Sequence, residues 1–166
     1  MTAITAERSY TLSYFDRPGA GPTILYVHGL GCSKSDFMEM ASVSELESFR
    51  VVAADNPGCG DSSYDVSRPL NIDGVVTVIE KFVAHLELDR FLLVGGSMGG
   101  LVAQFYAERN PNKVAGFANV EGNLAPEDCM FSRKVIPHSY PDFENLIFPQ
   151  IKKHALANQS EGLPSI

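Results

Sequence analysis

The chain has 166 residues, of which 45% are hydrophobic and 20% charged, and 13 basic against 20 acidic residues leave a formal charge of −7. This length suits one domain with one core, and the composition excludes disordered, collagen-like and coiled-coil chains. Because the basic residues are few and scattered, we expect no nucleic-acid partner and no membrane partner.

Three cysteines, Cys32, Cys59 and Cys129, lie far apart in the chain and form no C-x-x-C pair. This pattern indicates neither a disulfide framework nor a zinc site, and it favours a reducing compartment. The first ten residues contain no long apolar run and no signal-peptide cleavage pattern. We therefore expect a soluble protein of the cytoplasm.

The first predicted elements are two strands joined by a turn. Residues 9–15 alternate polar and apolar side chains and lead into a dense cluster of turn formers at 16–22. The second strand, 23–27, is apolar on both faces, as expected for a strand covered on both sides. A helix is predicted to begin after Ser35. The residues expected on its buried side are Phe37, Met38 and Ala41.

A second buried strand is predicted at residues 50–54, and it ends in the turn sequence D-N-P-G-C-G-D-S at 55–62. From 71 to 88, apolar residues recur at spacings of three and four, which is typical of an amphipathic helix with one buried stripe. The residues of this stripe are Val75, Val78, Ile79, Phe82, Val83 and Leu86.

The next elements are a strand at 91–94, a glycine-rich turn at 95–100, a helix at 101–109 and a strand at 114–120. Strands that alternate with helices in this way require crossover connections and favour a mostly parallel sheet with helices on both faces. The predicted fold class is therefore α/β, doubly wound.

The residue pattern of the sequence changes after Asn123. Pro126, Pro137, Pro141 and Pro149 interrupt the residues that follow, and no further strand is predicted there. The one strong helical stripe consists of Phe143, Leu146, Ile147 and Ile151. We therefore divide the chain into a core of residues 1–123 and a second segment of residues 124–166.

Ser97 is the predicted nucleophile, because Gly95 to Gly99 match the pattern G-x-S-x-G between a buried strand and a helix. A serine in such a tight turn adopts a strained backbone conformation, so small residues must flank it, and its hydroxyl is exposed at the carboxyl edge of the sheet. The alternatives are an N-capping serine in a glycine-rich turn and a dinucleotide-binding loop. A dinucleotide fingerprint would need G-x-G-x-x-G early in the chain and an acidic residue about 20 positions later.

Three motifs together resemble the α/β-hydrolase superfamily in order and spacing, and the likeness extends over almost the whole of residues 1–123. They are His28 to Gly31, Asp55 to Ser62 and Gly95 to Gly100. The resemblance implies a serine hydrolase without a cofactor, in which Ser97 attacks a carbonyl group of an ester or of a cleavable C–C bond. It also implies an oxyanion hole formed by the backbone N–H groups of Leu30 and Met98.

Two other polar residues of these motifs are expected to support loops. In this family the histidine of the His-Gly pair holds its loop by hydrogen bonding, so we favour that role for His28 over a role as general base. Asp55 begins a turn that resembles the structural turn of the family, so we favour loop hydrogen bonding over catalysis. Cys32 and Cys59, near the same loops, are expected to be packing residues.

Glu121 is the candidate acid of a catalytic triad. It follows the strand 114–120, so it is expected at the carboxyl edge of the sheet, one strand beyond Ser97. Some members of the family, such as haloalkane dehalogenases, carry their triad acid at this place. The alternatives are an exposed carboxylate at a strand end and a carboxylate that contacts substrate.

The general base has no clear counterpart in the sequence. The resemblance implies a triad histidine after a final strand, and none of His28, His85, His138 and His154 matches this context. His85 is expected to be solvated, and the second segment, which resembles the start of a lid or cap, holds His138 and His154 as alternatives. We therefore expect the base, and the last two strands of the fold, to lie outside this chain, which makes the sheet truncated.

An open apolar strand edge would favour self-association or a missing C-terminal segment as partner. The substrate is expected to be a small molecule with an apolar part. A serine in place of aspartate argues against dehalogenase and epoxide hydrolase chemistry, whereas haloperoxidase-like chemistry would use the same triad. The alternative function is a truncated, non-catalytic hydrolase fold kept for binding or assembly.

Overall fold

A computed structural model describes residues 2–5, 9–65, 67 and 69–153. The chain forms two compact units, residues 1–124 and residues 125–166. The first unit contains every described strand, and it also contains the three motifs that resemble the hydrolase superfamily. The boundary lies one residue from the predicted one, and the role of the second unit as a lid stays a prediction.

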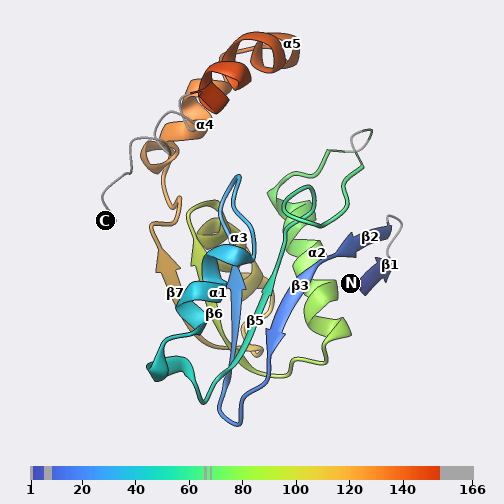
Figure 1. Cartoon of the computed structure of the whole chain (residues 1–166), viewed down its shortest axis with the longest axis vertical. Helices are drawn as coiled ribbons and strands as arrows, with labels where there is room; N and C mark the ends of the chain where they lie inside the picture. The colour runs from blue at the N-terminus through green and yellow to red at the C-terminus, as the bar shows by residue number, and fades with distance from the viewer. Residues whose placement is uncertain (1, 6–8, 66, 68, 154–166) are drawn as a thin grey trace. The chain divides into compact units, whose positions relative to one another are not determined.

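A five-stranded sheet in the order β3-β5-β4-β6-β7 forms the first unit (Figure 1). Strands β5, β4, β6 and β7 are parallel, and β3 at one edge is antiparallel to β5. Their bounds are β3 (Tyr14–Arg17), β4 (Thr23–Val27), β5 (Arg50–Ala54), β6 (Phe91–Gly96) and β7 (Val114–Val120). The prediction of a mostly parallel sheet is therefore confirmed.

A short antiparallel ribbon of β1 (Thr2–Thr5) and β2 (Ser9–Leu12) precedes the sheet. The single strand predicted at residues 9–15 is thus two strands, with Ser13 between them. The backbone of Ser13 does not pair within a strand there, since its carbonyl oxygen accepts the N–H of Asp55 at 2.9 Å. The break therefore ties the start of β3 to the loop that follows β5.

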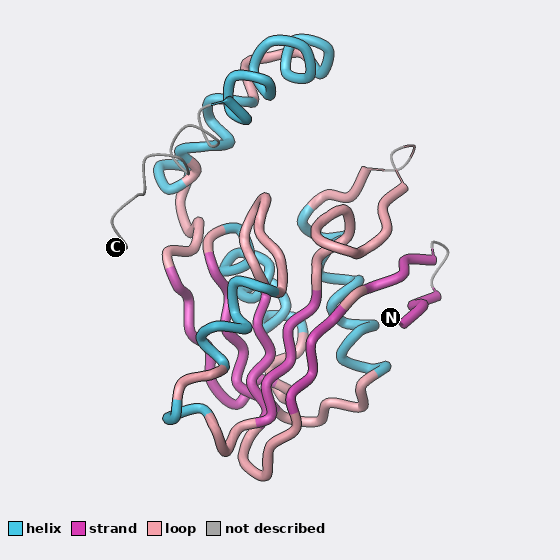
Figure 2. Tube along the Cα trace, viewed as in Figure 1, coloured by secondary structure: helices cyan, strands magenta, loops and turns pink. Residues whose placement is uncertain are grey.

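Helices cover both faces of the sheet (Figure 2), as expected for a doubly wound fold. On one face pack α2 (Ile72–His85) and α3 (Met98–Arg109), and on the other packs α1 (Ser35–Ala41), which is followed by the short helix η1 (Ser44–Leu46). The side chain of Asn71 caps α2 by accepting the N–H of Gly74 at 2.9 Å.

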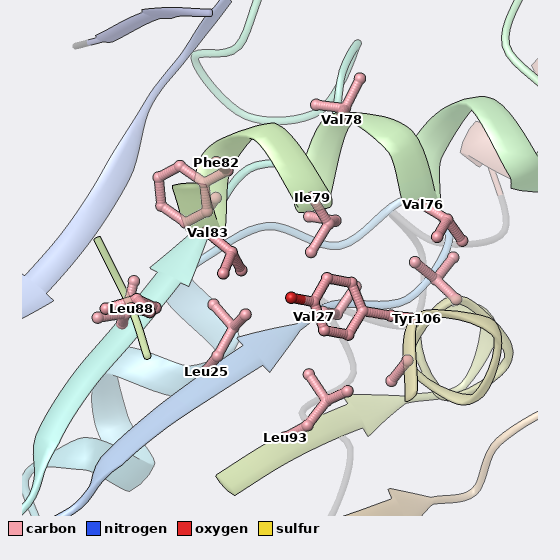
Figure 3. Close-up of a cluster of buried hydrophobic side chains, with 14 of the residues drawn as sticks. Leu25, Val27, Val76, Val78, Ile79, Phe82, Val83, Leu88, Leu93 and Tyr106 are labelled. Carbon is pink, nitrogen blue, oxygen red and sulfur yellow. The ribbon is translucent and has the colours of Figure 1, made fainter. Parts of the chain in front are cut away.

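The larger core lies between the sheet and the helices α2 and α3 (Figure 3). Leu25, Val27 and Leu93 of the sheet pack against one row of side chains from α2 and another from α3, all of them buried. The helix residues are Val76, Val78, Ile79, Phe82 and Val83 of α2 and Val102, Ala103 and Tyr106 of α3. This packing positions β4 and β6, and therefore the loops that follow their carboxyl ends.

Helix α1 and helix α2 differ from the prediction at one position each. Met38 was expected to be buried but is 42% exposed, because on a seven-residue helix Phe37 and Ala41 lie one turn apart and face the sheet while Met38 points away. Val76 lies outside the predicted stripe of α2 but is fully buried. Helix α3 packs beside α2 and covers part of α2 outside the predicted stripe, which is why Val76 is buried.

Helix α3 begins three residues earlier than predicted, at Met98 instead of Leu101. Its first turn therefore consists of Met98, Gly99 and Gly100, and β6 extends to Gly96. A single residue, Ser97, separates the strand from the helix.

The second unit is helical in its described part, residues 125–153. It contains η2 (Pro126–Asp128), α4 (Met130–Val135), α5 (Tyr140–Asp142) and the π-helical η3 (Phe143–Ile147), and the last helix continues to residue 153. Ser139 caps this helix, and Pro141 stands in its first turn, where a proline costs no helical hydrogen bond. Throughout the described ranges of the chain, we find no helix with the length and apolarity needed to cross a membrane.

Candidate active site

Ser97 occupies a strained turn between β6 and α3. Its φ of 51° and ψ of −123° lie in a region that side-chain-bearing residues rarely adopt. The turn is so tight that a side chain at Gly99 would collide with the backbone oxygen of Val27, and one at Gly95 with the backbone of Gly99. The flanking glycines predicted from the G-x-S-x-G pattern are therefore required by close backbone approach.

The backbone of Ser97 is held by the end of the neighbouring strand. Its N–H donates to the carbonyl oxygen of Val120 at 2.9 Å, and its carbonyl oxygen accepts the N–H of Gly100 at 2.9 Å and that of Asn123 at 3.4 Å. The residue is exposed, and its hydroxyl makes no hydrogen bond to another described residue. The structure thus presents a free hydroxyl on a fixed, strained backbone.

The loop after β4 runs directly beside Ser97. A Cβ atom on Gly29 would lie 3.0 Å from the Cβ of Ser97 and 3.6 Å from its Oγ. Leu30 follows Gly29 in this loop and is 54% exposed, and Met98 begins α3. Among the described residues, neither the N–H of Leu30 nor that of Met98 has a hydrogen-bond partner. Both amides are therefore available beside Ser97, and their role in an oxyanion hole stays a prediction.

His28 is fully buried and supports this loop, as predicted. Its Nε2 accepts the backbone N–H of Asn56 at 2.8 Å, and its Nδ1 lies 2.8 Å from the carbonyl oxygen of Gly29, to which it donates. Burial lowers the pKa of His28 below the ordinary value of an imidazole. A neutral ring with both nitrogens occupied has no free nitrogen for the proton of Ser97.

Asp55 is also fully buried and also supports the loops, as predicted. Its Oδ1 accepts the N–H of Lys34 at 2.7 Å, and its Oδ2 accepts the Nζ of Lys34 at 2.6 Å and the N–H of Asp61 at 3.0 Å. Burial acts to raise the pKa of Asp55, but the bonds from Lys34 and Asp61 outweigh it and lower the pKa below the ordinary value. Sequence reasoning missed Lys34, although a buried carboxylate always requires a partner.

Glu121 stands next to Ser97 in the register of the sheet. Val120 pairs with Gly96, so the residues that follow them, Glu121 and Ser97, leave the sheet at the same level. Glu121 has a φ of 52°, is exposed and directly follows β7. Two non-glycine residues with positive φ therefore stand at the ends of adjacent strands, which is typical of functional sites.

No histidine other than His28 is placed beside Ser97 in the described part of the first unit. His85 is exposed at the end of α2, as expected. His138 belongs to the second unit, and His154 lies outside the described residues. The identity of the general base thus stays a prediction.

The two thiols near the loops are poor nucleophiles. Burial, together with nearby Asp36, raises the pKa of Cys32 to about 11, and burial also raises the pKa of Cys59. Both thiols are protonated at neutral pH, in agreement with a packing role. Within the described ranges, no group of three or more histidine, cysteine, aspartate or glutamate side chains is arranged to hold a metal ion.

The comparison with known families decides the assignment of the fold. Residues 22–151 match the sequence model of the alpha/beta hydrolase fold. The chain belongs to the α/β hydrolase fold family. The motif order and the sheet order described above are those expected of a member, and the predicted superfamily is confirmed.

The chain spans about a third to a half of the length of the α/β hydrolases that it resembles. It is 35% identical over 116 residues to the monoacylglycerol lipase ABHD6 of Bos taurus, covering 69% of this chain and 34% of the lipase. A solved membrane phospholipase A, described as a bacterial virulence factor, is 30% identical with a TM-score of 0.65, over 74% of this chain and 39% of that chain. Cfl2 of Burkholderia cenocepacia shares the fold alone, with a TM-score of 0.70 and 22% identity over 89% and 53% of the two chains.

Proposed function

We propose that this chain is the nucleophile-bearing part of a serine hydrolase that cleaves carbonyl substrates by a Ser-His-acid mechanism. The observation that carries the proposal is the geometry of Ser97, a free hydroxyl on a strained turn, together with the unpaired N–H groups of Met98, which follows it, and of Leu30 in the adjacent loop. A serine held only for helix capping would bond its hydroxyl to the first turn of α3, and Ser97 makes no such bond.

In the proposed reaction the Oγ of Ser97 attacks the carbonyl carbon of the substrate, and its proton passes to the imidazole of the base. The carbonyl electrons move to the oxygen, which the N–H groups of Leu30 and Met98 stabilise. The intermediate then expels the leaving group, which takes the proton from the imidazolium. A water molecule next attacks the acyl-enzyme and gives its proton to the imidazole, and the acid is released as the Oγ of Ser97 takes that proton back. Losing one donor of such a hole typically costs about 3 kcal/mol of transition-state stabilisation.

Glu121 is the proposed acid that orients the imidazole. Its register beside Ser97 and its positive φ support this role, because both residues leave the sheet at the same edge. The proposed base is a histidine outside the described residues.

The proposed substrate is a carboxylic ester with an apolar acyl or alkyl part. Relatives with at least 30% identity are named as monoacylglycerol lipases, a diacylglycerol lipase and a membrane phospholipase A, which favours an ester over a C–C bond. The exposed side chain of Leu30, in the loop whose Gly29 lies beside Ser97, offers an apolar surface to such a group.

Active-site labelling tests the proposal. A fluorophosphonate probe should label the full-length gene product, and Ser97→Ala should abolish the label. Ser42→Ala is the matched control, because Ser42 is an exposed serine at the end of α1 whose hydroxyl bonds only to Glu39 within the described structure. Labelling that persists in Ser97→Ala would refute the assignment.

A non-catalytic module for binding or assembly is the second candidate. It is favoured by the lack of a base beside Ser97 in the described residues, and by the exposure of Phe117 and Val120, 42% and 49%, on the edge strand β7. We propose that this edge supports self-association or the binding of a further segment. A full-length product that takes no label but forms a stable dimer in light scattering would favour this second function.

A further inference from the structure

Lys34 is bonded through both its backbone and its side chain to one buried carboxylate. Its N–H and its Nζ reach the two oxygens of Asp55 at 2.7 Å and 2.6 Å, and its Nζ also contacts Asp61 at 3.0 Å. The Asp55 side chain is completely buried, whereas the Asp61 side chain is 71% exposed. The ion pair with Asp55 is therefore the one that is protected from solvent.

Asp55 is itself held by its backbone and its surroundings. Its backbone N–H donates to Ser13, its backbone oxygen accepts the hydroxyl of Ser62 at 2.8 Å, and its carboxylate fills the space where a side chain at Gly60 would stand. A partner of this carboxylate is consequently held in one place relative to β5 and the core.

Lys34 closes the loop that carries Leu30. The loop begins at Gly29, turns at Gly31 with a φ of 75°, and is bridged by the N–H of Cys32, which donates to Gly29 at 3.3 Å. Lys34 then caps α1, and its carbonyl oxygen accepts the N–H of Phe37 at 3.2 Å. His28 holds the start of this loop and Lys34 holds its end. The N–H of Leu30 therefore lies between two fixed residues.

We propose that Lys34 is a positioning residue, which holds the Leu30 N–H toward the developing oxyanion through its ion pair with Asp55. The inference rests on the proposed function, because it gives Lys34 a purpose only if Leu30 is a donor of the oxyanion hole. Two carboxylates face the ammonium group, so its charge is balanced locally and it acts by fixing geometry.

The test compares two ion pairs at opposite ends of β5. Lys34→Met removes the ammonium group but keeps the apolar stem and the backbone bond to Asp55. Arg50→Met is the matched control, because it breaks the pair of Arg50 with Asp16, 2.8 Å apart, at the other end of the strand. Both variants are made in the full-length gene product and measured with p-nitrophenyl esters, a fluorophosphonate probe and thermal melting.

We expect Lys34→Met to lower kcat and the rate of fluorophosphonate labelling about tenfold while KM changes less than about twofold, since a small misplacement of a stabilising group mainly affects the transition state. Arg50→Met should keep both rates within about twofold. Lys34→Arg, which restores a cation at this place, should recover most of the rate, and it also serves if Lys34→Met does not fold.

Wild-type rates in Lys34→Met, or equal losses in Lys34→Met and Arg50→Met, would overturn the positioning role. Failure of Lys34→Arg to exceed Lys34→Met would do the same. If the wild-type protein takes no label at Ser97, the proposed function itself fails, and this inference fails with it.

Discussion

The two ends of the parallel strands are built differently. At the amino end, Arg50 and Asp16 form a partly exposed ion pair, and the Arg17 guanidinium bonds to backbone oxygens of the segment that follows α1. At the carboxyl end lie the four buried polar or charged side chains of the described core. They are Ser13, His28, Asp55 and Asn56.

The comparison shows at which end of the sheet the energetically unfavourable features of this fold are concentrated. Buried polar groups are tolerated only when hydrogen bonded, and the strained backbones of Ser97 and Glu121 add further cost at the same end. The amino end carries fewer of them among its described residues, namely the positive φ of Glu87, shortly before β6, and the buried Nε of Arg17, which has no hydrogen-bond partner. Because most of the unfavourable features lie at the carboxyl edge of the sheet, we expect substitutions there to cost the most activity and stability.

The largest effect expected at the carboxyl end is that of Glu121→Gln. In the full-length gene product this change should leave the fold intact but lower kcat by about a thousandfold or more, because the imidazole loses its orientation and its charge partner. Steady-state kinetics with an ester substrate measures it. A loss below about tenfold, or about 1.4 kcal/mol, would reduce Glu121 to a bystander.

The next effect concerns stability, through Gly99→Ala. The added methyl group collides with the backbone oxygen of Val27, which cannot move without breaking the sheet, so we expect a loss of about 3 kcal/mol in the free energy of unfolding. Gly31→Ala is the control, because Gly31 has open space around it and loses only its preferred φ, at a cost of about 1 kcal/mol. Equal urea midpoints for the two variants would contradict the close packing of the turn.

A smaller effect at the same end depends on pH. The folded state lowers the pKa of His28, so below about pH 6.5 the unfolded chain binds a proton that the folded protein excludes. The free energy of unfolding should therefore fall as the pH drops from 7.5 to 5.5, by up to about 1.4 kcal/mol per pH unit. The loss from Asp55 starts at lower pH, because its pKa is lowered and the carboxylate stays ionised in this window.

Urea titrations at the two pH values measure this dependence. His28→Gln should flatten it, and His85→Gln, at an exposed site, should leave it unchanged. A stability that does not vary with pH in the wild-type protein would show that His28 is not held neutral.

The smallest effect belongs to the amino end. Arg50→Met should cost less than about 1 kcal/mol, since a partly exposed ion pair is screened by water and salt. Denaturation in urea measures it. A loss as large as that of Gly99→Ala would remove the contrast between the two ends.

Much of this fold could be predicted from local patterns. Strands 23–27, 50–54 and 114–120 have the predicted bounds, because each is an apolar run closed by turn residues. The strained turn at Ser97 was also predictable, because its glycine spacing reflects close backbone contact. His28 and Asp55 support loops as predicted, although their partners were not named.

The remaining features depend on contacts between distant residues. Lys34 looks like an ordinary surface lysine in the sequence, and only the fold brings it to Asp55, 21 positions away. Val76 is buried because α3 packs beside α2, which no periodicity within α2 reveals. The positive φ of Glu121 has no sequence signal, since glutamate seldom adopts it. The identity of the general base stays a prediction.

The hydrogen bonds that join Ser97 to Val120, at the end of β7, and to Asn123, just after it, have a consequence for biosynthesis. A ribosome releases Ser97 before Val120 and Asn123, so the nascent strand β6 emerges without the carbonyl and the amide that later hold its turn. We expect the strained backbone of Ser97 to form only when β7 docks. The exposed hydroxyl of Ser97 would thus reach its final position only after β7 has joined the sheet.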